Sequence, residues 1–238
     1  MFGTRLHAQL VNWHFIHLEC EYCIYYCHNA NGIVIIAIHV NNFFMLRDSK
    51  HALSHFKTQL QTRWQISDGS PAHFHIGITI EHDRAARTLT LSQTALIDRV
   101  VSQFGLTDAH PVAIPFESGH YLSKDPSPKS DDKRATMSRT PYRELIGSLM
   151  YLAIRTRPDI VFAINQLCRF LDCYGKTHWK AAKRVVRYLK GTCNFRLVLG
   201  GEHVVCLLGY TDSDYASCPD TRRSTSGYCF PLRSGLIS

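Results

Sequence analysis

Short apolar and β-branched runs, separated by polar residues, predict several β-strands in the first third of the chain. The first of these runs cover residues 23–27, 33–40 and 43–46, and Asn41-Asn42 lies between the last two. Because Asn tolerates the positive φ of a tight turn, we expect these two strands to form a β-hairpin joined by the asparagines. At such an exposed tip a pair of aspartates would bind a divalent cation, whereas this chain offers two neutral amides.

Residues 73–81 and 87–91 predict a second hairpin, because apolar and polar residues alternate along both segments. The apolar face of its first strand is predicted to hold Phe74, Ile76, Ile78 and Ile80. Helical periodicity precedes and follows this hairpin. Asp48 is predicted to cap a helix that runs to about Trp64, and a further helix is predicted over residues 92–104.

Residues 117–140 are polar and contain two prolines, so they predict a linker or a long surface loop. Three helices are predicted after this segment, and they begin near Pro141, Pro158 and Thr177. Each has apolar residues at helical spacing, which gives the helix one buried face. Pro is favoured at the first helical position and Thr at the N-cap, while Gly191 supplies a stop for the last helix.

The last part of the chain predicts two more strands, from Val204 to Tyr210 and over residues 225–232. Asp212 follows the first of them, so its carboxylate is predicted to lie at the end of a buried strand. Many Mg²⁺-dependent nucleases hold a metal ion with such a carboxylate, but they need further carboxylates from other elements. A turn or capping aspartate is the alternative, and the local pattern favours neither.

The formal net charge of +8 is concentrated in the second half, since residues 1–120 carry −1 and residues 121–238 carry +9. This asymmetry favours a polyanionic partner, most simply nucleic acid, although a basic soluble surface would give the same count. The last predicted helix places four cations on one face with no acidic residue beside them: Lys180, Lys183, Arg184 and Arg187. We expect this face to contact the phosphates of a nucleic acid, and a solvated helix face is the alternative.

The composition, with 45% apolar and 19% charged residues, is that of a globular protein with one core or two small ones. No apolar run approaches the roughly 18 residues of a membrane span, and the N-terminus lacks a signal-peptide pattern. We therefore expect an intracellular protein, cytoplasmic or nuclear, with no membrane partner. The nine cysteines favour reduced thiols. The spacing of Cys20, Cys23 and Cys27 is compatible with zinc ligands, but no second well-placed pair of ligands follows them.

Eight short motifs occur in a characteristic order along the chain. They are Asn41-Asn42 in its hairpin, Leu91-Ser92-Gln93, and the segments 75–80, 142–152, 156–160, 187–192, 210–216 and 222–228. Each motif is weak alone. Taken in sequence from about residue 23 onward, they resemble the polymerase polyprotein of copia-type retrotransposons, where the end of the reverse transcriptase joins the start of ribonuclease H.

This resemblance implies an α+β fold built from parts of a larger enzyme. Residues 1–116 would form a partial reverse transcriptase palm, 117–140 a linker or long loop, 141–200 a helical thumb or connection region, and 201–238 the first strands of a ribonuclease H-like fold. The family is an RNA-directed DNA polymerase with ribonuclease H activity, and its cofactor is Mg²⁺. The resemblance also implies association with other parts of the transposon polyprotein.

The catalytic positions depart from the family pattern. The polymerase centre of the family looks like Tyr-Val-Asp-Asp at the hairpin tip, and the matching residues here are His39-Val40-Asn41-Asn42. Asn41 and Asn42 therefore stand at degenerate positions of the paired aspartates. The resemblance further implies that the third aspartate, much of the palm and the fingers lie upstream of this chain. It supplies only Asp212 of the ribonuclease H metal ligands.

Phosphoryl transfer by two Mg²⁺ ions needs anionic oxygens to hold hard cations, and an amide offers one neutral oxygen instead. We therefore expect the hairpin to fold but not to bind metal productively, and the chain not to polymerise on its own. One alternative is a non-catalytic nucleic-acid-binding module. Another is a decayed transposon fragment without function that folds poorly, because unpaired strand edges favour aggregation.

Overall fold

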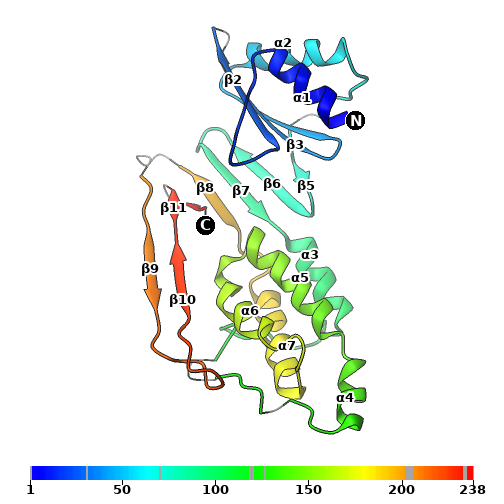
Figure 1. Cartoon of the computed structure of the whole chain (residues 1–238), viewed down its shortest axis with the longest axis vertical. Coiled ribbons are helices and arrows are strands. Elements are labelled where there is room, and N and C mark those ends of the chain that lie inside the picture. Colours follow the sequence, from blue (N-terminus) through cyan, green and yellow to red (C-terminus); the bar gives the residue numbers. More distant parts are fainter. Residues whose placement is uncertain are drawn as a thin grey trace. The chain divides into compact units, whose positions relative to one another are not determined.

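The structure is a computed structural model that describes residues 2–30, 32–69, 71–117, 119, 121–125, 127–201, 206–232 and 235–237. The chain divides into two compact units, Met1–Ala72 and His73–Ser238, which are described separately below (Figure 1). Together they contain both helices and several small antiparallel sheets, so the expected mixed α and β composition is confirmed.

The first unit is a four-stranded antiparallel sheet in the order β1-β2-β3-β4, packed against two helices. Its elements are α1 (Phe2–Asn12), β1 (Ile16–His17), β2 (Ile24–Asn29), β3 (Gly32–His39), β4 (Asn42–Arg47) and α2 (Lys50–Gln61). The core joins Leu10 of α1 and Phe56 of α2 to Val34 and Ile36 on one face of β3. The opposite face of the sheet remains partly exposed at Ile35 and its neighbours.

The second unit contains a helical bundle, a second four-stranded sheet and two small hairpins. Its helices are α3 (Thr94–Gln103), α4 (Asp131–Ser138), α5 (Tyr142–Arg155), the short 3₁₀ helix η1 (Pro158–Ile160), α6 (Val161–Cys168) and α7 (Lys176–Gly191). Its strands are β5 (Phe74–His75), β6 (Ile78–Asp83), β7 (Thr88–Ser92), β8 (Leu197–Gly200), β9 (Tyr210–Ser213), β10 (Ser226–Cys229), β11 (Pro231–Leu232) and β12 (Gly235–Leu236).

One apolar core holds the helices of the second unit together. Fully buried residues come from α3, α5, η1, α6 and α7, and they include Leu149, Leu167 and Val185. The apolar faces predicted for these helices from their spacing are therefore confirmed. Strands β7 and β8 pair antiparallel with Leu91 opposite Leu197, so the sheet joins segments that lie far apart along the chain.

The first hairpin is present, but its turn lies one residue earlier than predicted. His39 pairs with Asn42 in the β3–β4 register, so the two turn residues are Val40 and Asn41. Val40 adopts a φ of 53°, whereas Asn41 is not among the residues with positive φ. A positive φ at the first turn position alone is the pattern of a type II′ turn, which normally has Gly there. The expectation that both asparagines form the turn is wrong, because the strand pairing extends to Asn42.

The segment 73–81 was expected to be one strand, and this expectation is wrong. His75 pairs with Ile78, so β5 and β6 form a hairpin around Ile76 and Gly77. Both turn residues have positive φ, 46° and 74°. Gly adopts this conformation without steric strain. Gly77 therefore permits a tight turn, which interrupts the predicted strand. Ile76 consequently leaves the expected apolar face and is 41% exposed.

Two predicted helix caps are also wrong. Ser49, and not Asp48, caps α2, since the Ser49 side chain accepts a hydrogen bond from the His51 amide. Asp48 instead accepts a 2.8 Å hydrogen bond from the backbone N–H of Ile33. Thr177 lies inside α7, whose N-cap is Gly175. In α2 the Ser49 hydroxyl therefore satisfies one backbone donor of the first turn, whereas in α7 the His178 ring accepts from the N-cap amide of Gly175.

The segment 117–140 contains α4, which the polar composition did not predict. Leu122 belongs to the core of the second unit, and Met137 is buried as well. Much of this segment therefore packs onto the bundle, because single apolar side chains fix it at intervals.

The end of the chain is less regular than predicted. Val204 and Val205, the first residues of the expected apolar strand, lie outside the described residues. In the described part, Leu207 makes an isolated bridge to Leu232, and the strand β9 begins only at Tyr210. All four residues of β9 are exposed, so the expectation that Asp212 lies at the end of a buried strand is wrong.

Candidate active site and nucleic acid interface

The hairpin tip of the first unit presents side chains to solvent. Val40 is 74% exposed, and Asn41 and Asn42 are exposed as well. The ladder between β3 and β4 is complete up to the pair His39–Asn42, so backbone pairing holds the tip at the end of a regular hairpin. The structure thus places Asn41 in the turn and Asn42 at the start of β4.

The residues at this tip do not fit the Mg²⁺ ions of the family. The nearest acidic residue along either strand is Asp48, which binds the Ile33 amide at the other end of the hairpin. His39 lies six positions after Ile33, which is about 20 Å of extended strand. Among the residues that the structure describes, no three His, Cys, Asp or Glu side chains are arranged to hold a metal ion. A hard divalent cation would find neutral amides here instead of carboxylates.

Asp212 lies in an exposed strand with its carboxylate engaged locally. Its Oδ1 accepts a 2.8 Å hydrogen bond from the Ser213 amide, and the residue pairs with Gly227 of β10. The nearby Asp214 accepts hydrogen bonds from the Ser217 hydroxyl at 2.6 Å and from the Thr225 amide at 2.9 Å. These hydrogen bonds lower the pKa of Asp214. The Asp214 carboxylate therefore links the end of β9 to the residue before β10, whereas the Asp212 carboxylate bonds only to its own neighbour.

The predicted cationic face of α7 is present on one side of the helix. Lys180 is exposed, whereas Lys183, Arg184 and Arg187 are half-buried. The buried side of the same helix holds Val185 and its neighbours in the core. The helix is therefore amphipathic in the predicted sense, with its cations facing away from the bundle core.

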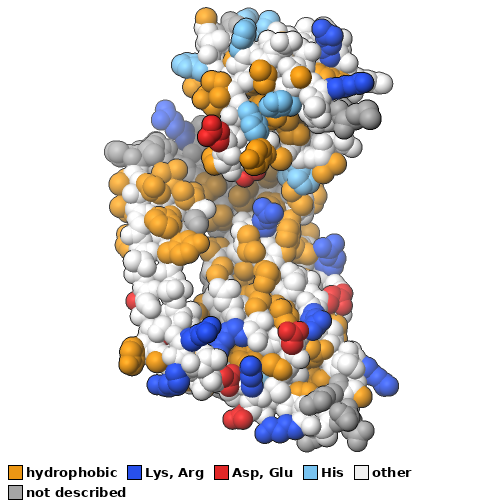
Figure 2. Space-filling model, viewed as in Figure 1, with side chains coloured by type: hydrophobic (Ala, Val, Ile, Leu, Met, Phe, Trp, Pro, Cys, Tyr) orange, Lys and Arg blue, Asp and Glu red, His pale blue; other side chains and the backbone are white. Residues whose placement is uncertain are grey.

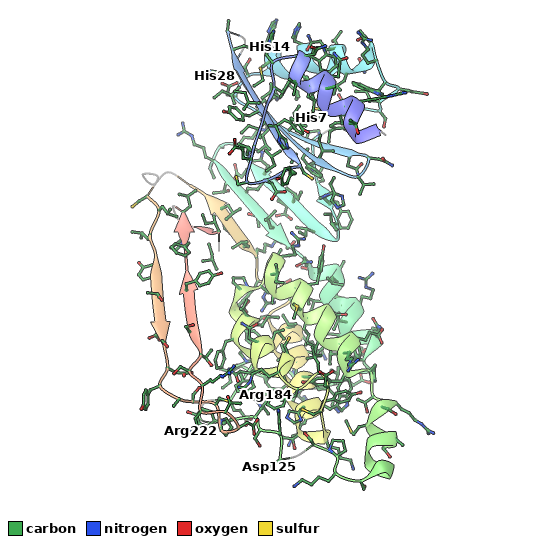
Figure 3. All side chains as sticks on the ribbon, in the orientation of Figure 1. His7, His14, His28, Asp125, Arg184 and Arg222 are labelled. Carbon is green, nitrogen blue, oxygen red and sulfur yellow. The ribbon has the colours of Figure 1, made fainter. Side chains whose placement is uncertain are left out.

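Contacts on this face show which cations are paired. Arg184, which is labelled in Figure 3, forms an ion pair with Glu117 at 2.7 Å, so the expectation that nothing acidic lies beside these cations is wrong. The Nε atom of Arg187 donates to the carbonyl of His110 at 2.6 Å, which fixes the side chain without neutralising its charge. Lys183 lies over the ring of Trp179, at 5.7 Å from its centroid.

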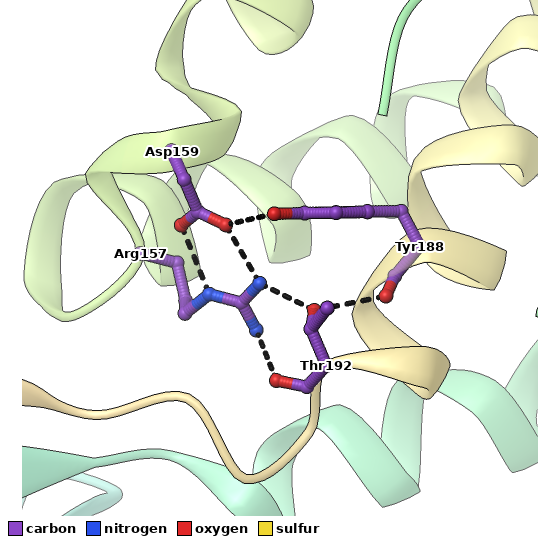
Figure 4. Close-up of polar contacts among 4 residues, drawn as sticks. All are labelled: Arg157, Asp159, Tyr188 and Thr192. Carbon is purple, nitrogen blue, oxygen red and sulfur yellow. Dashed lines mark hydrogen bonds and ion pairs between the residues drawn. The ribbon is translucent and has the colours of Figure 1, made fainter. Parts of the chain in front are cut away.

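A buried polar cluster in the second unit was not predicted (Figure 4). Arg157 is 1% exposed, and its guanidinium donates to the Asp159 carboxylate at 2.8 and 2.9 Å. It also donates to the carbonyl and the hydroxyl of Thr192 at 3.0 and 2.6 Å. The Tyr188 hydroxyl completes the cluster by donating to Asp159 at 2.8 Å. The cluster therefore joins η1 to the end of α7.

The electrostatics of this cluster follow from its burial. Burial alone would raise the pKa of Asp159, but the hydrogen bonds from Arg157 and Tyr188 and the Arg157 charge outweigh this effect and lower it. Burial and the Asp159 carboxylate together raise the pKa of Tyr188. The cluster is thus a charged, hydrogen-bonded pair with a neutral phenol. The sequence offered one signal for it, since its residues belong to the motif segments 156–160 and 187–192.

His178 is a second buried polar residue that the sequence did not single out. The ring is fully buried and stacks on Phe170 at 4.2 Å. Its Nδ1 accepts from the Gly175 amide at 2.9 Å, and its Nε2 lies 3.0 Å from the Ser123 carbonyl. Because one ring nitrogen must accept while the other donates, the ring is neutral in this arrangement. Burial lowers the pKa of His178.

Comparison with known proteins shows to which family the chain belongs. Residues 1–118 match the family model described as "Reverse transcriptase (RNA-dependent DNA polymerase)". The chain is 36% identical over 217 residues to the "Retrovirus-related Pol polyprotein from transposon TNT 1-94" of Nicotiana tabacum, which covers 91% of this chain and 16% of that protein. The chain belongs to the reverse transcriptase family of copia-type retrotransposons.

Other proteins are similar to this chain over most of its length. The "Retrovirus-related Pol polyprotein from transposon RE1" of Arabidopsis thaliana is 30% identical over 235 residues, which are 99% of this chain and 15% of that protein. The "Uncharacterized mitochondrial protein AtMg00810" of the same plant is 30% identical over 207 residues, which are 85% of this chain and 80% of that protein. The chain thus spans about a sixth of the length of the two Pol polyproteins.

No solved structure matches this reverse transcriptase chain significantly. Within the described residues, no helix is both long enough and apolar enough to cross a membrane.

Proposed function

We propose that this chain is a reverse transcriptase segment of a copia-type element that does not catalyse polymerisation. The observation that carries the proposal is the exposed hairpin tip with Asn41 and Asn42, which by the motif resemblance would stand where the family has its paired aspartates. Two amides there replace two negative charges, and no described acidic cluster compensates for them. Productive Mg²⁺ binding, which the family requires, is therefore not expected in this chain.

Metal binding to a restored tip tests the proposal. The change Asn41→Asp with Asn42→Asp should create a weak Mn²⁺ site, detected as paramagnetic broadening of the NMR signals of residues 39–43. The native chain should show no such broadening. The variant Gln59→Glu with Gln61→Glu adds the same two charges on α2 and should leave the tip signals sharp. Mg²⁺-dependent primer extension by the native chain, or equal Mn²⁺ broadening of the native tip, would overturn the proposal.

A second candidate function is nucleic acid binding through α7. The favouring observation is the cationic face itself, on which Lys180, Lys183 and Arg187 have no acidic partner among the described ion pairs. About three phosphate contacts predict that the logarithm of the binding constant falls with the logarithm of salt with a slope of about −2 to −3. Such binding would be indifferent to sequence, because phosphate contacts position a duplex without reading its bases.

The ion pair of Arg184 sharpens the test of this function. Lys180→Ala with Lys183→Ala should weaken binding to a primer–template duplex by about tenfold or more and make the salt slope shallower. Arg184→Ala, whose charge is offset by Glu117, should weaken it less. Arg63→Ala, an exposed change outside the face, serves as the control. Binding that survives replacement of Lys180, Lys183, Arg184 and Arg187 together would exclude this interface.

We also propose the finer assignment of parts that the family suggests: a partial palm in residues 1–116, a connecting segment in 117–140, a thumb or connection region in 141–200, and a ribonuclease H-like start in 201–238. The complete ladder of the β3–β4 hairpin supports the first part. Asp212, at the β9–β10 hairpin, would be the ribonuclease H-like carboxylate of an incomplete site. Other parts of the polyprotein are the proposed protein partners.

A further inference from the structure

The first unit contains a pocket of about 270 Å³ on the helical side of its sheet. The pocket lies between the end of α1, the strands β2 and β3, and α2, so one compact unit supplies all of its walls. Its floor consists of side chains that are at most 6% exposed: Phe15, Cys27, Val34, Ala52 and Phe56. The floor is therefore apolar and is part of the core of this unit.

Two aromatic rings belong to this floor, and a third lies beside them. Phe15 and Phe56 lie 4.9 Å apart between ring centroids, and Trp13 meets Phe56 edge to face at 6.0 Å. Aromatic rings favour offset or edge-to-face packing with another flat ring at such distances. A planar aromatic molecule on this floor would continue an arrangement that the protein's own rings already make.

The rim of the pocket is polar and carries no charged carboxylate, lysine or arginine. Its side chains are Asn12, His14, His55 and Gln59, together with Asn29. Within the described part of the chain, no residue hydrogen-bonds to the side chains of Asn12, His14, His55 or Gln59. His14 stands at the end of α1 with a φ of 62° (Figure 3). Amide and imidazole groups therefore surround the opening with donors and acceptors for a neutral ligand.

From these observations we propose that the pocket binds a neutral, fused bicyclic nitrogen heteroaromatic molecule, the chemistry that a free purine base and indole share. The size agrees, because a dry apolar cavity of about 150 Å³ holds benzene and this pocket has room for a second ring. The apolar floor would bury the rings, and the rim amides would pair with the ring nitrogens. This inference concerns a face of the first unit away from the hairpin tip and is independent of the proposed function.

Titration of the full chain with indole and, separately, with adenine tests the proposal. We expect saturable changes with a Kd below about 1 mM for at least one probe, read from the indole N–H signals in a ¹H–¹⁵N spectrum. The signals of Trp13 and Trp64, in the first unit, should move. The signal of Trp179, in the second unit, should remain in place and serves as an internal control. Binding of adenine alone or of indole alone would support the site and identify the preferred ring.

Two variants tie the binding to this pocket. Ala52→Leu fills the floor from α2 and should weaken binding more than tenfold. Gln59→Ala removes one rim amide without changing the core and should weaken it by about three- to tenfold. Gln61→Ala, on the same helix but outside the pocket, should leave binding unchanged. Absence of saturation for both probes, or binding that neither pocket variant weakens, would overturn the proposal.

Discussion

The hairpin tip of the first unit and the Arg157 cluster of the second both lie in motif segments of the copia-type family, yet their surroundings differ completely. The tip is exposed, and the side chains of Asn41 and Asn42 lie at the surface. Arg157 is buried, and every contact of its guanidinium described above is to another motif residue. Side chains at the tip can therefore change without disturbing the packing of the first unit, whereas the Arg157 motif is itself part of the packing. Similarity of motifs alone does not distinguish these two roles.

Replacing the buried guanidinium should have the largest effect. Arg157→Ala leaves the partly buried Asp159 carboxylate without its cation, and the loss of one partner from a buried pair costs about 3–5 kcal/mol. The urea-induced unfolding transition of the second unit measures this change in the free energy of unfolding. Arg143→Ala breaks the exposed pair with Asp172 and should cost less than about 1 kcal/mol. Equal effects of the two substitutions would show that the buried cluster is not a structural element.

Acid should weaken the second unit more than the first. The pKa of His178 is lowered by burial, so the unfolded chain binds a proton more readily than the folded chain does. Stability should therefore be complete above the unfolded pKa of about 6.5 and fall as the pH drops below it, by at most about 1.4 kcal/mol per pH unit. Denaturation curves between pH 7 and pH 5 measure the slope.

The variant His178→Gln is the informative comparison for this slope. Gln at the third helical position can accept from the N-cap amide and does not titrate. It should flatten the pH dependence, whereas His82→Gln on the exposed strand β6 should leave the slope unchanged. If His178→Gln keeps the full slope, the titrating group is another one.

A smaller gain of stability is expected at the hairpin tip. Val40 is β-branched and has a φ of 53°, a conformation that is unfavourable by about 1–2 kcal/mol for residues other than Gly. Val40→Gly should therefore stabilise the first unit by up to about 1 kcal/mol after the entropy of Gly is subtracted. Asn41→Gly, at a position without positive φ, should be neutral or destabilising. Thermal unfolding measures the stability of both variants relative to the native chain. A destabilised Val40→Gly variant would contradict the turn geometry.

Local sequence patterns predicted most elements but not their junctions. The helices of the second unit could be predicted because each has apolar residues at helical spacing. The β5–β6 turn was missed because Ile76 continues the alternation, while the backbone freedom of Gly77 allows the chain to reverse there. Strand β8 and the Arg157 cluster depend on partners distant in sequence, which local patterns do not contain. At the candidate site the sequence predicted the cations of α7, but it missed Glu117 for the same reason.

The pairing of β7 with β8 has a consequence for synthesis and folding. Leu91 pairs with Leu197, so more than 100 residues are translated between the two strands. At a translation rate of about 5–20 residues per second, β8 is synthesised on the order of 5–20 s after β7. During that time its outer edge is open to other strands, and closing so long a loop carries a logarithmic entropy penalty. The four-stranded sheet of the second unit should consequently form later than the sheet of the first unit and depend more on chaperones than that sheet does.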